Sequence, residues 1–176
     1  MAAGLSDPDA MTLSTVAPDG QPSSRQVLLK GLDERGLVFY TNLESRKGRE
    51  LEGNARVSLL FFWRELDTQV EVQGAAEPVS DAEADAYFAS RPRGSQLGAW
   101  ASAQSRELSG RARLVADVAR TEARFLGRAV DRPPWWAGFR VVPRRFEFWH
   151  RGLFRLHDRV AYEKEGDGWR SKRLYP

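Results

Sequence analysis

Short runs of alternating apolar and polar residues, separated by brief turn signals, constrain the fold of this chain most strongly. Residues 11–17 alternate in this way, 18–20 (Pro-Asp-Gly) signal a turn, and 23–30 form the returning run. Residues 33–36 signal a second turn before an apolar run over 37–42. Because a period of two sends successive side chains to opposite faces of a strand, these runs predict three strands joined as an antiparallel meander.

The rest of the chain continues this pattern and inserts helices into it. Further strands are expected over 57–63, 69–79 (with a bulge at Gly74), 139–149, 155–163 and 169–174. Helices are expected over 45–52, 80–91 and 94–101, and a longer one from Ser109. Roughly eight strands and three or four helices predict a mainly β (α+β) fold, a closed antiparallel barrel with helices inserted between its strands. A doubly wound parallel sheet is disfavoured because turns join the strands.

The helix boundaries rest on specific capping signals. Ser45 is a good N-cap, and Ser80 with Glu83 three residues later forms a capping box. The longest helix carries Leu114, Val118 and Phe125 on one face, which we expect to be buried.

Composition narrows the class of protein. Hydrophobic residues make up 41% of the 176 residues, which is enough for the core of a single domain over 1–176, with residues 1–8 as a disordered or truncated lead. The chain has no cysteine, only two histidines, no apolar run long enough to cross a bilayer and no secretory signal. These features predict a cytoplasmic protein without a metal centre, a membrane partner or thiol chemistry.

Positive charge is concentrated towards the C-terminus. From Arg140 onward, ten Lys and Arg residues stand against five Asp and Glu, although the net charge of the chain is only +3. Such a bias suits nucleic acid or a phosphorylated small molecule. The sequence contains no nucleic-acid-binding motif, so we favour the small anion.

The segment 148–159 contains both histidines and three arginines. In an extended strand, Arg155, His157 and Arg159 would share one face and suit an anionic, partly aromatic ligand. The competing interpretation is a solvated basic edge strand.

Two phosphate-binding groups are predicted elsewhere. Tyr40-Thr41-Asn42 precedes Ser45-Arg46-Lys47 at a helix N-terminus, where hydroxyls, amides and cations suit a phosphate. Tyr87 and Arg91 share a helix face just before Ser95, and these three residues form the second predicted phosphate-binding group. The alternatives are simple capping by Ser45 with exposed cations, and a surface pair of little energetic value.

No catalytic motif accompanies these groups. The sequence lacks a nucleophile elbow, a P-loop, a dinucleotide-binding glycine motif and a metalloprotease motif. Phosphate-binding groups without obvious catalytic acids and bases indicate that a cofactor carries out the reaction.

Together these segments resemble the pyridoxine (pyridoxamine) 5′-phosphate oxidase family. The matching segments cover nearly the whole chain from about Asp7: RQVLLK (25–30), FYTN (39–42), SRKGREL (45–51), VSLLFFW (57–63), YFASRPRGSQLGAWAS-QS (87–105), GFRVVP (138–143), EFW (147–149), RLHDR (155–159) and RLYP (173–176).

The resemblance implies an FMN-binding split barrel that acts as a homodimer with FMN at the subunit interface. It assigns FMN binding to Arg25, Gln26, Val27, Leu28, Leu29, Lys30, Tyr40, Thr41, Arg46, Lys47, Gln69, Gln104, Ser105, Trp149 and Arg159. It assigns substrate binding to Lys30, Tyr87, Arg91, Ser95, Arg155 and His157. Arg155 and His157 are the candidate catalytic residues, which would position the substrate at its reacting carbon.

The implied activity is oxidation of pyridoxamine or pyridoxine 5′-phosphate to pyridoxal 5′-phosphate, with dioxygen as acceptor and hydrogen peroxide as product. The turn over 150–154 (His-Arg-Gly-Leu-Phe) departs from the family pattern and is bulkier, which opens the question of the substrate. The alternatives are a related flavin oxidase acting on another ring, such as a phenazine precursor, and a non-catalytic module that binds flavin or pyridoxal phosphate.

Overall fold

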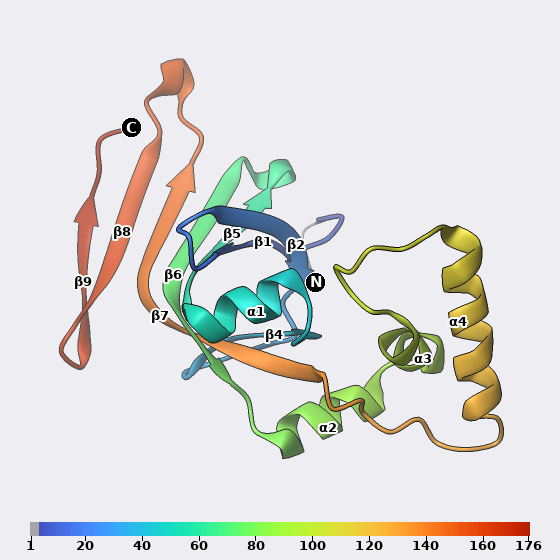
Figure 1. The fold of residues 1–176 in the computed structure, drawn as a ribbon. Helices are drawn as coiled ribbons and strands as arrows, with labels where there is room; N and C mark the ends of the chain where they lie inside the picture. Colours follow the sequence, from blue (N-terminus) through green and yellow to red (C-terminus); the bar gives the residue numbers. More distant parts are fainter. Residues whose placement is uncertain (1–3) are drawn as a thin grey trace.

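The computed structural model describes residues 4–176, whose strands form one antiparallel sheet curved into a split barrel (Figure 1). The strand order is β2-β1-β5-β6-β7-β4-β3, with β8 paired to β7 and β9 to β8. The nine strands of the described part are β1 (Ala10–Val16), β2 (Pro22–Leu28), β3 (Gly31–Asp33), β4 (Gly36–Asn42), β5 (Arg56–Trp63), β6 (Thr68–Pro78), β7 (Trp136–His150), β8 (Asp158–Glu165) and β9 (Gly168–Arg173).

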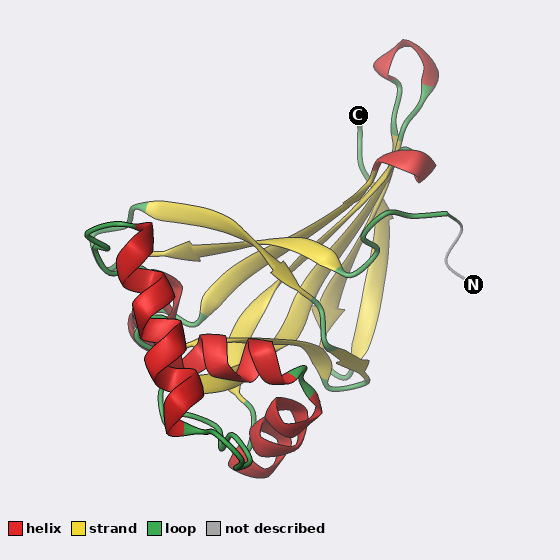
Figure 2. Cartoon of the chain, turned by 90° about the vertical axis from the view of Figure 1, so that its right-hand side faces the viewer, coloured by secondary structure: helices red, strands yellow, loops and turns green. Residues whose placement is uncertain are grey.

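Three of the four described α-helices gather on one side of the barrel, while β8 and β9 extend from the other side (Figures 1 and 2). The fourth helix, α1, lies against β1. The helices are α1 (Arg46–Gly53), α2 (Asp81–Ser90), α3 (Arg93–Ala101) and α4 (Arg111–Arg124), and single 3-10 turns are η1 (Arg64–Leu66) and η2 (Leu153–Arg155).

Two apolar cores hold these parts together. Alternate residues of β1 point into the barrel, where Met11 and Leu13 are fully buried. The second core joins the helices to the start of β7 through Phe88, Phe125 and Trp136. Burial of a side chain of this size contributes about 2 kcal/mol. The second core therefore fixes α2 and α3 beside the end of β4.

The predicted meander is wrong in its third strand. The hairpin of β1 and β2 is confirmed, but β4 pairs with β3 and β7 instead of β2. Burial gives the physical reason. All of β4 except Tyr40 is buried, which requires neighbours on both sides, whereas alternate residues of β2 are exposed. The bulge at Gly74 is confirmed by a register shift after Gln73. Within residues 4–176 the strands do not pair into a closed ring, so the barrel is split rather than closed.

The strand predicted over 155–163 begins only at Asp158. Phe154 and Arg155 have φ values of +55° and +65°, which interrupt the extended backbone with a tight turn. Gly152 permits this turn, since a Cβ there would lie 1.8 Å from the carbonyl oxygen of Leu156. The predicted row of Arg155, His157 and Arg159 on one strand face is therefore not formed.

The capping predictions are confirmed at the N-caps. Ser45 accepts from Gly48 N and Ser80 accepts from Glu83 N. The carboxylate of Glu83 pairs with Arg140 at 2.8 Å, so the second half of the capping box is replaced by an ion pair.

The start and the buried face of the longest helix were predicted incorrectly. This helix, α4, begins at Arg111 after Gly110, not at Ser109. Val118 on the face predicted to be buried is 37% exposed, whereas Phe125 just beyond the helix is buried.

The N-terminal lead is described from Gly4, and residues 1–3 of the predicted lead lie outside the described residues. Trp63 Nε1 donates to the carbonyl oxygen of Pro8 at 3.1 Å, and Ser6 Oγ donates to Glu65 at 3.2 Å. Within residues 4–176, none of the helices combines the length and the apolar character that crossing a membrane requires.

Candidate active site

A cavity of about 870 Å³ lies where β2, β4, α1 and α3 meet. Five cations and no carboxylate line it, so it suits a ligand with more than one negative charge. The lining residues are Ser23, Ser24, Arg25, Gln26, Val27, Leu28, Lys30, Tyr40, Thr41, Asn42, Arg46, Lys47, Tyr87, Arg91, Ser95, Gly98, Ala99, Ser102, Gln104, Ser105 and Trp136.

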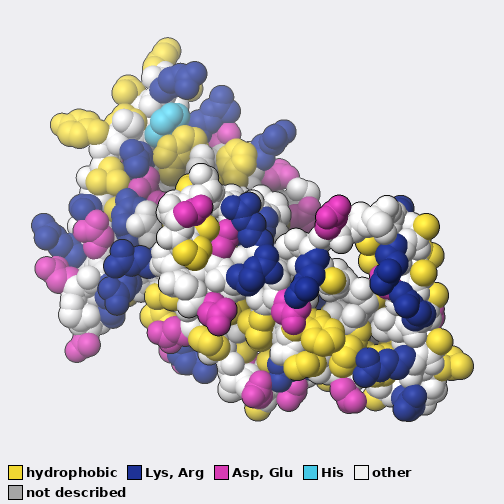
Figure 3. Space-filling view, in the orientation of Figure 1, with side chains coloured by type: hydrophobic (Ala, Val, Ile, Leu, Met, Phe, Trp, Pro, Cys, Tyr) yellow, Lys and Arg dark blue, Asp and Glu magenta, His cyan; other side chains and the backbone are white. Residues whose placement is uncertain are grey.

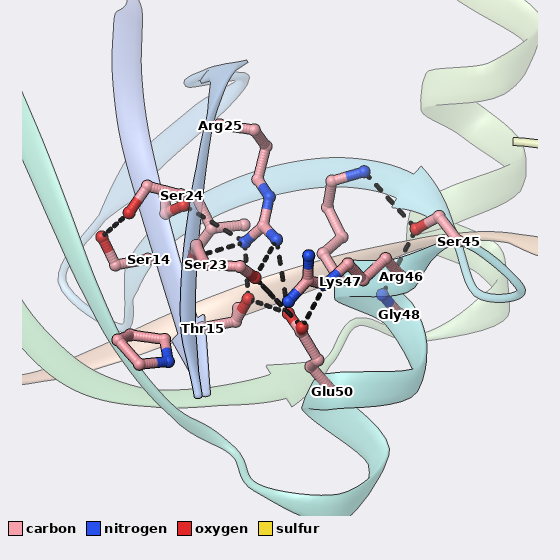
Figure 4. A network of polar contacts seen from close by, with 12 residues as sticks. Ser14, Thr15, Ser23, Ser24, Arg25, Ser45, Arg46, Lys47, Gly48 and Glu50 are labelled. Carbon is pink, nitrogen blue, oxygen red and sulfur yellow. Dashed lines mark hydrogen bonds and ion pairs between the residues drawn. The ribbon is translucent and has the colours of Figure 1, made fainter. Parts of the chain in front are cut away.

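Two of these cations share a buried counter-ion, Glu50 (Figure 4). Arg46 Nε donates to Glu50 at 2.8 Å, and Arg25 Nη2 does so at 3.3 Å. Thr15 and Ser23 also donate to this carboxylate. These four donors lower the pKa of Glu50 to about 2 against the opposing effect of burial.

Lys47 is a buried cation that faces polar oxygens rather than a carboxylate. Its Nζ donates to Thr41 Oγ1 and to Gln104 Oε1, both at 3.2 Å. Burial, together with the nearby charge of Arg25, lowers the pKa of Lys47. A bound anion beside Nζ would offset this desolvation, which makes Lys47 a candidate phosphate ligand.

Aromatic rings form one wall of the cavity. Tyr40 stacks on Tyr87 with 4.1 Å between ring centroids and on Trp136 with 5.0 Å. Gly138 on β7 makes room for this stack, since a Cβ there would lie 2.6 Å from the Tyr40 ring. The wall offers a flat apolar surface suited to a planar ligand.

Arg91 lies between this wall and the start of α3. Its guanidinium carbon is 5.0 Å from the Trp136 ring centroid, and its Nη1 is buried without a hydrogen-bond acceptor among the described residues. Burial lowers the pKa of Arg91. Ser95 lies in the first turn of α3, where the helix dipole favours an anion. The unsatisfied donor and the hydroxyl together fit a phosphate group.

A second group of predicted site residues lies away from the cavity, at the far end of the sheet. Gln69, Trp149 and Arg159 are aligned on three neighbouring strands. The ring of His157 packs against that of Trp149 with 4.5 Å between centroids and a tilt of 42°, and Arg155 is exposed in η2. In Figures 1 and 2, η2 and the end of β7 lie opposite α2 and α3.

The structure thus divides the predicted site residues into two groups. The cavity brings together Arg25, Gln26, Val27, Leu28, Lys30, Tyr40, Thr41, Arg46, Lys47, Tyr87, Arg91, Ser95, Gln104 and Ser105. Outside it lie Leu29, which packs against the barrel core, and Gln69, Trp149, Arg155, His157 and Arg159. Sequence reasoning missed Glu50 and Trp136, although the four-residue spacing of Arg46 and Glu50 is a detectable signal.

The basic excess of the C-terminal strands is largely paired with acids. Figure 3 shows basic and acidic side chains interspersed over β8 and β9. Arg145 contacts Glu71 and Glu147, and Lys172 contacts Glu163 at 2.6 Å. The predicted charge bias therefore forms a surface network of ion pairs.

We expect acid to destabilise the protein through Glu50. Its pKa is about 2 when folded against an ordinary value of 4.5, so its carboxylate stabilises the fold above pH 4.5 and loses this effect as the pH falls toward 2. Over the whole transition the difference corresponds to roughly 3 kcal/mol, of which about 2 kcal/mol is lost between pH 6 and pH 3. Urea unfolding at pH 6 and pH 3 measures it, and Glu50→Gln should lose less stability than the wild type across this range. Equal losses in both proteins would contradict the prediction.

A split antiparallel barrel with a basic, aromatic-walled cavity is the architecture of the FMN-binding split-barrel class. The family model for pyridoxamine 5′-phosphate oxidase matches residues 1–125, and the model for the C-terminal dimerisation region of pyridoxine 5′-phosphate oxidase matches residues 136–176. The chain belongs to the pyridoxamine 5′-phosphate oxidase family.

Curated relatives agree with this assignment. A pyridoxine/pyridoxamine 5′-phosphate oxidase from Rubrobacter xylanophilus is 59% identical over 174 residues, which cover 99% of this chain and 80% of that protein. A protein of the same name from Azorhizobium caulinodans is 59% identical over 172 residues, covering 97% and 81%.

Solved structures agree on the fold. PhzG from Burkholderia lata 383, in complex with tetrahydrophenazine-1-carboxylic acid, has a TM-score of 0.92 at 38% identity, covering 98% of this chain and 84% of that one. A pyridoxamine 5′-phosphate oxidase-related FMN-binding protein from Nostoc punctiforme has a TM-score of 0.76 at 16% identity, covering 96% and 89%.

The residues of the cavity fit FMN, the cofactor of this family. Lys47 is a buried cation without a carboxylate partner among the described residues, which suits the flavin phosphate. The backbone and side chains of β2 beside it offer an extended edge for a ring system.

Proposed function

We propose that this protein is an FMN-dependent oxidase that converts pyridoxamine or pyridoxine 5′-phosphate to pyridoxal 5′-phosphate. The observation that carries the proposal is one cavity with two groups of cations and hydroxyls, each of which suits a phosphate. Arg25, Arg46 and Lys47 form the first group, and Arg91 and Ser95 form the second. Two groups suit a phosphorylated cofactor and a phosphorylated substrate held side by side. The names of the 59% identical relatives support the same activity.

In this proposal the first group binds the cofactor. Arg46 and Lys47, at the N-terminus of α1, would hold the FMN phosphate, and the cavity-lining residues of β2 would contact its ring system. When bound, FMN supplies the two-electron acceptor that the side chains of the cavity lack. Dioxygen is the final acceptor and leaves as hydrogen peroxide; with the amine substrate, water replaces the nitrogen, which leaves as ammonia.

The second group binds the substrate. Arg91 Nη1 donates to the substrate phosphate, which gives this buried donor its missing acceptor. Ser95 adds a hydroxyl, and Tyr87 contributes an aromatic face. Lys30, which pairs with Asp9 at 2.7 Å, completes the group on the β2 side. These contacts would orient the substrate ring in the cavity that also holds the cofactor.

The C-terminal group of residues serves the cavity of a second protomer. Gln69, Trp149, Arg155, His157 and Arg159 do not line the cavity of their own chain. The match of residues 136–176 to a dimerisation region supports a homodimer, and in this proposal the group closes the partner's site. Each dimer would then contain two composite sites.

Within that group, His157 is held in one tautomer. The amide of Gly152 donates to His157 Nδ1 at 3.2 Å, so the neutral imidazole carries its proton on Nε2. Nε2 is then a hydrogen-bond donor. We assign it, together with Arg155, to positioning the substrate at its reacting carbon rather than to proton abstraction.

Turnover by the purified, FMN-loaded protein tests the proposal. Incubation with pyridoxamine 5′-phosphate under oxygen should yield pyridoxal 5′-phosphate, peroxide and ammonia in equal amounts, and no turnover should occur without dioxygen. Unphosphorylated pyridoxamine is the matched control and should react poorly, because it leaves Arg91 without an acceptor. Bound FMN without turnover of the phosphorylated substrate would contradict the proposal.

A phenazine-type substrate is the second candidate, since PhzG was solved with tetrahydrophenazine-1-carboxylic acid. A compound of that kind carries a carboxylate but no phosphate. The identity of 59% to oxidases of the B6 phosphates, against 38% to PhzG, favours the phosphorylated substrate. Faster turnover of a reduced phenazine carboxylate than of pyridoxamine 5′-phosphate would reverse this order.

A further inference from the structure

Glu50 lies behind the cavity rather than in its lining. Its side chain is 4% exposed and approaches β1 and β2 from α1. Both arginines of the first phosphate-binding group, Arg25 and Arg46, are bonded to this single carboxylate (Figure 4). Among the described residues, Lys47 is the only cation of that group that makes no bond to Glu50.

A second layer of hydroxyls holds the carboxylate and Arg25 together. Thr15 Oγ1 donates to Glu50 Oε2 at 2.5 Å and accepts from Arg25 Nη1 at 2.5 Å. Ser23 Oγ donates to Glu50 Oε2 at 2.7 Å and accepts from Arg25 Nη2 at 2.5 Å. A guanidinium held at both Nη atoms has few alternative orientations.

The bonds to Glu50 leave part of each guanidinium available. Arg46 donates to Glu50 through Nε, and within the described residues its two Nη atoms have no acceptor. Arg25 donates through its Nη atoms, and its Nε has no acceptor there. With Lys47, three positive charges stand against one negative charge. The net charge of +2 matches a phosphate monoester, which carries close to two negative charges at neutral pH.

We propose that Glu50 is a positioning residue for the cofactor phosphate, which holds Arg25 and Arg46 in the orientation that binds it. This inference rests on the proposed function, because it takes the phosphate to be that of FMN. Thr15 extends the positioning network by one further contact, from a place outside the cavity lining.

The sign of one mutational effect separates positioning from simple charge compensation. A carboxylate near a phosphate repels it, so removing the charge of a bystander should tighten FMN binding. Loss of a positioning carboxylate should weaken FMN binding instead, because the two arginines lose their shared anchor. Riboflavin has the same ring without the phosphate, and its binding should not change in either case.

Titration of the full-length protein, freed of flavin, with FMN and with riboflavin tests this inference through quenching of flavin fluorescence. Glu50→Gln should weaken FMN binding about tenfold and leave riboflavin binding unchanged. Thr15→Val should weaken FMN binding about threefold, and it decides the matter if Glu50→Gln does not fold. Glu71→Gln is the matched control, since Glu71 also accepts from an arginine and a serine but lies outside the cavity. It should leave both affinities unchanged.

The outcomes are distinct. FMN binding that is unchanged or tighter in Glu50→Gln would overturn the inference and leave the proposed function standing. Equal weakening for FMN and riboflavin would also overturn it, since Glu50 would then only maintain the fold of the cavity. A wild-type protein that binds riboflavin as tightly as FMN would overturn both the phosphate site and the inference.

Discussion

Replacing Arg91 with alanine is expected to raise the KM for pyridoxamine 5′-phosphate by about 10- to 100-fold while the flavin content stays unchanged. The variant would lose the charge-assisted bond to the substrate phosphate that we propose for Arg91, and a bond of this kind contributes about 1.5–3 kcal/mol. Nη1 of Arg91 is buried without an acceptor among the described residues. The alanine substitution therefore also removes the free-energy cost of burying this unpaired donor. Steady-state kinetics with varied substrate, together with the flavin absorbance of the purified protein, measure both parts of the expectation.

Two further arginine variants serve as controls. Arg46→Ala should show the reverse pattern, with flavin lost from the purified protein, because we propose that Arg46, which lines the cavity, binds the cofactor phosphate. Arg93→Ala should change neither parameter, since the Arg93 guanidinium donates to backbone carbonyls of Phe125 and Arg128. Flavin loss in Arg91→Ala would show that the two phosphate-binding groups have been assigned in the wrong order.

Hybrid dimers are expected to recover activity that neither parent variant has. One protomer carries Arg91→Ala and the other His157→Ala, and each homodimer should fall below a tenth of the wild-type kcat/KM. If His157 serves the partner's cavity, the hybrid contains one cavity with both residues intact. Its kcat/KM should therefore be about half of the wild-type value. Hybrids isolated through two different affinity tags, assayed at low substrate concentration, provide the measurement.

The alternative placement of His157 predicts a clearly different kcat/KM for the hybrid dimer. If His157 served the cavity of its own chain, both sites of the hybrid would carry one defect. The activity would then lie between those of the parent homodimers. A hybrid of two Arg91→Ala protomers with different tags controls for the purification.

Local signals in the sequence predicted most of the elements and one half of the site. The N-caps Ser45 and Ser80 were found because each bond is made within three residues. The Tyr87, Arg91 and Ser95 group was found because helix geometry fixes the spacing of its first two members. The cavity brings this group together with Arg46 and Lys47, although they are far apart in the sequence.

Features that depend on contacts between residues far apart in the chain could not be predicted from the sequence. The pairing of β4 with β7 joins residues about one hundred positions apart, so local alternation favoured the wrong neighbour. Glu50 depends on Thr15 and Ser23 from another part of the chain. The strand pattern over 155–163 was overridden at Arg155, where the backbone enters the left-handed region that the alternation of side chains does not reveal.

Because no carboxylate among the described residues lines the cavity, we expect the stability of the folded protein to depend on the concentration of its cofactor. Burial desolvates Lys47 and Arg91, and the nearby charge of Arg25 also repels Lys47, so both cations oppose folding until anions are bound. A ligand that binds only the folded state adds RT ln(1 + [L]/Kd) to the free energy of unfolding, about 2.7 kcal/mol at one hundred times Kd. FMN bound in this cavity would therefore stabilise the folded state, and a cell depleted of flavin should accumulate less of the folded protein.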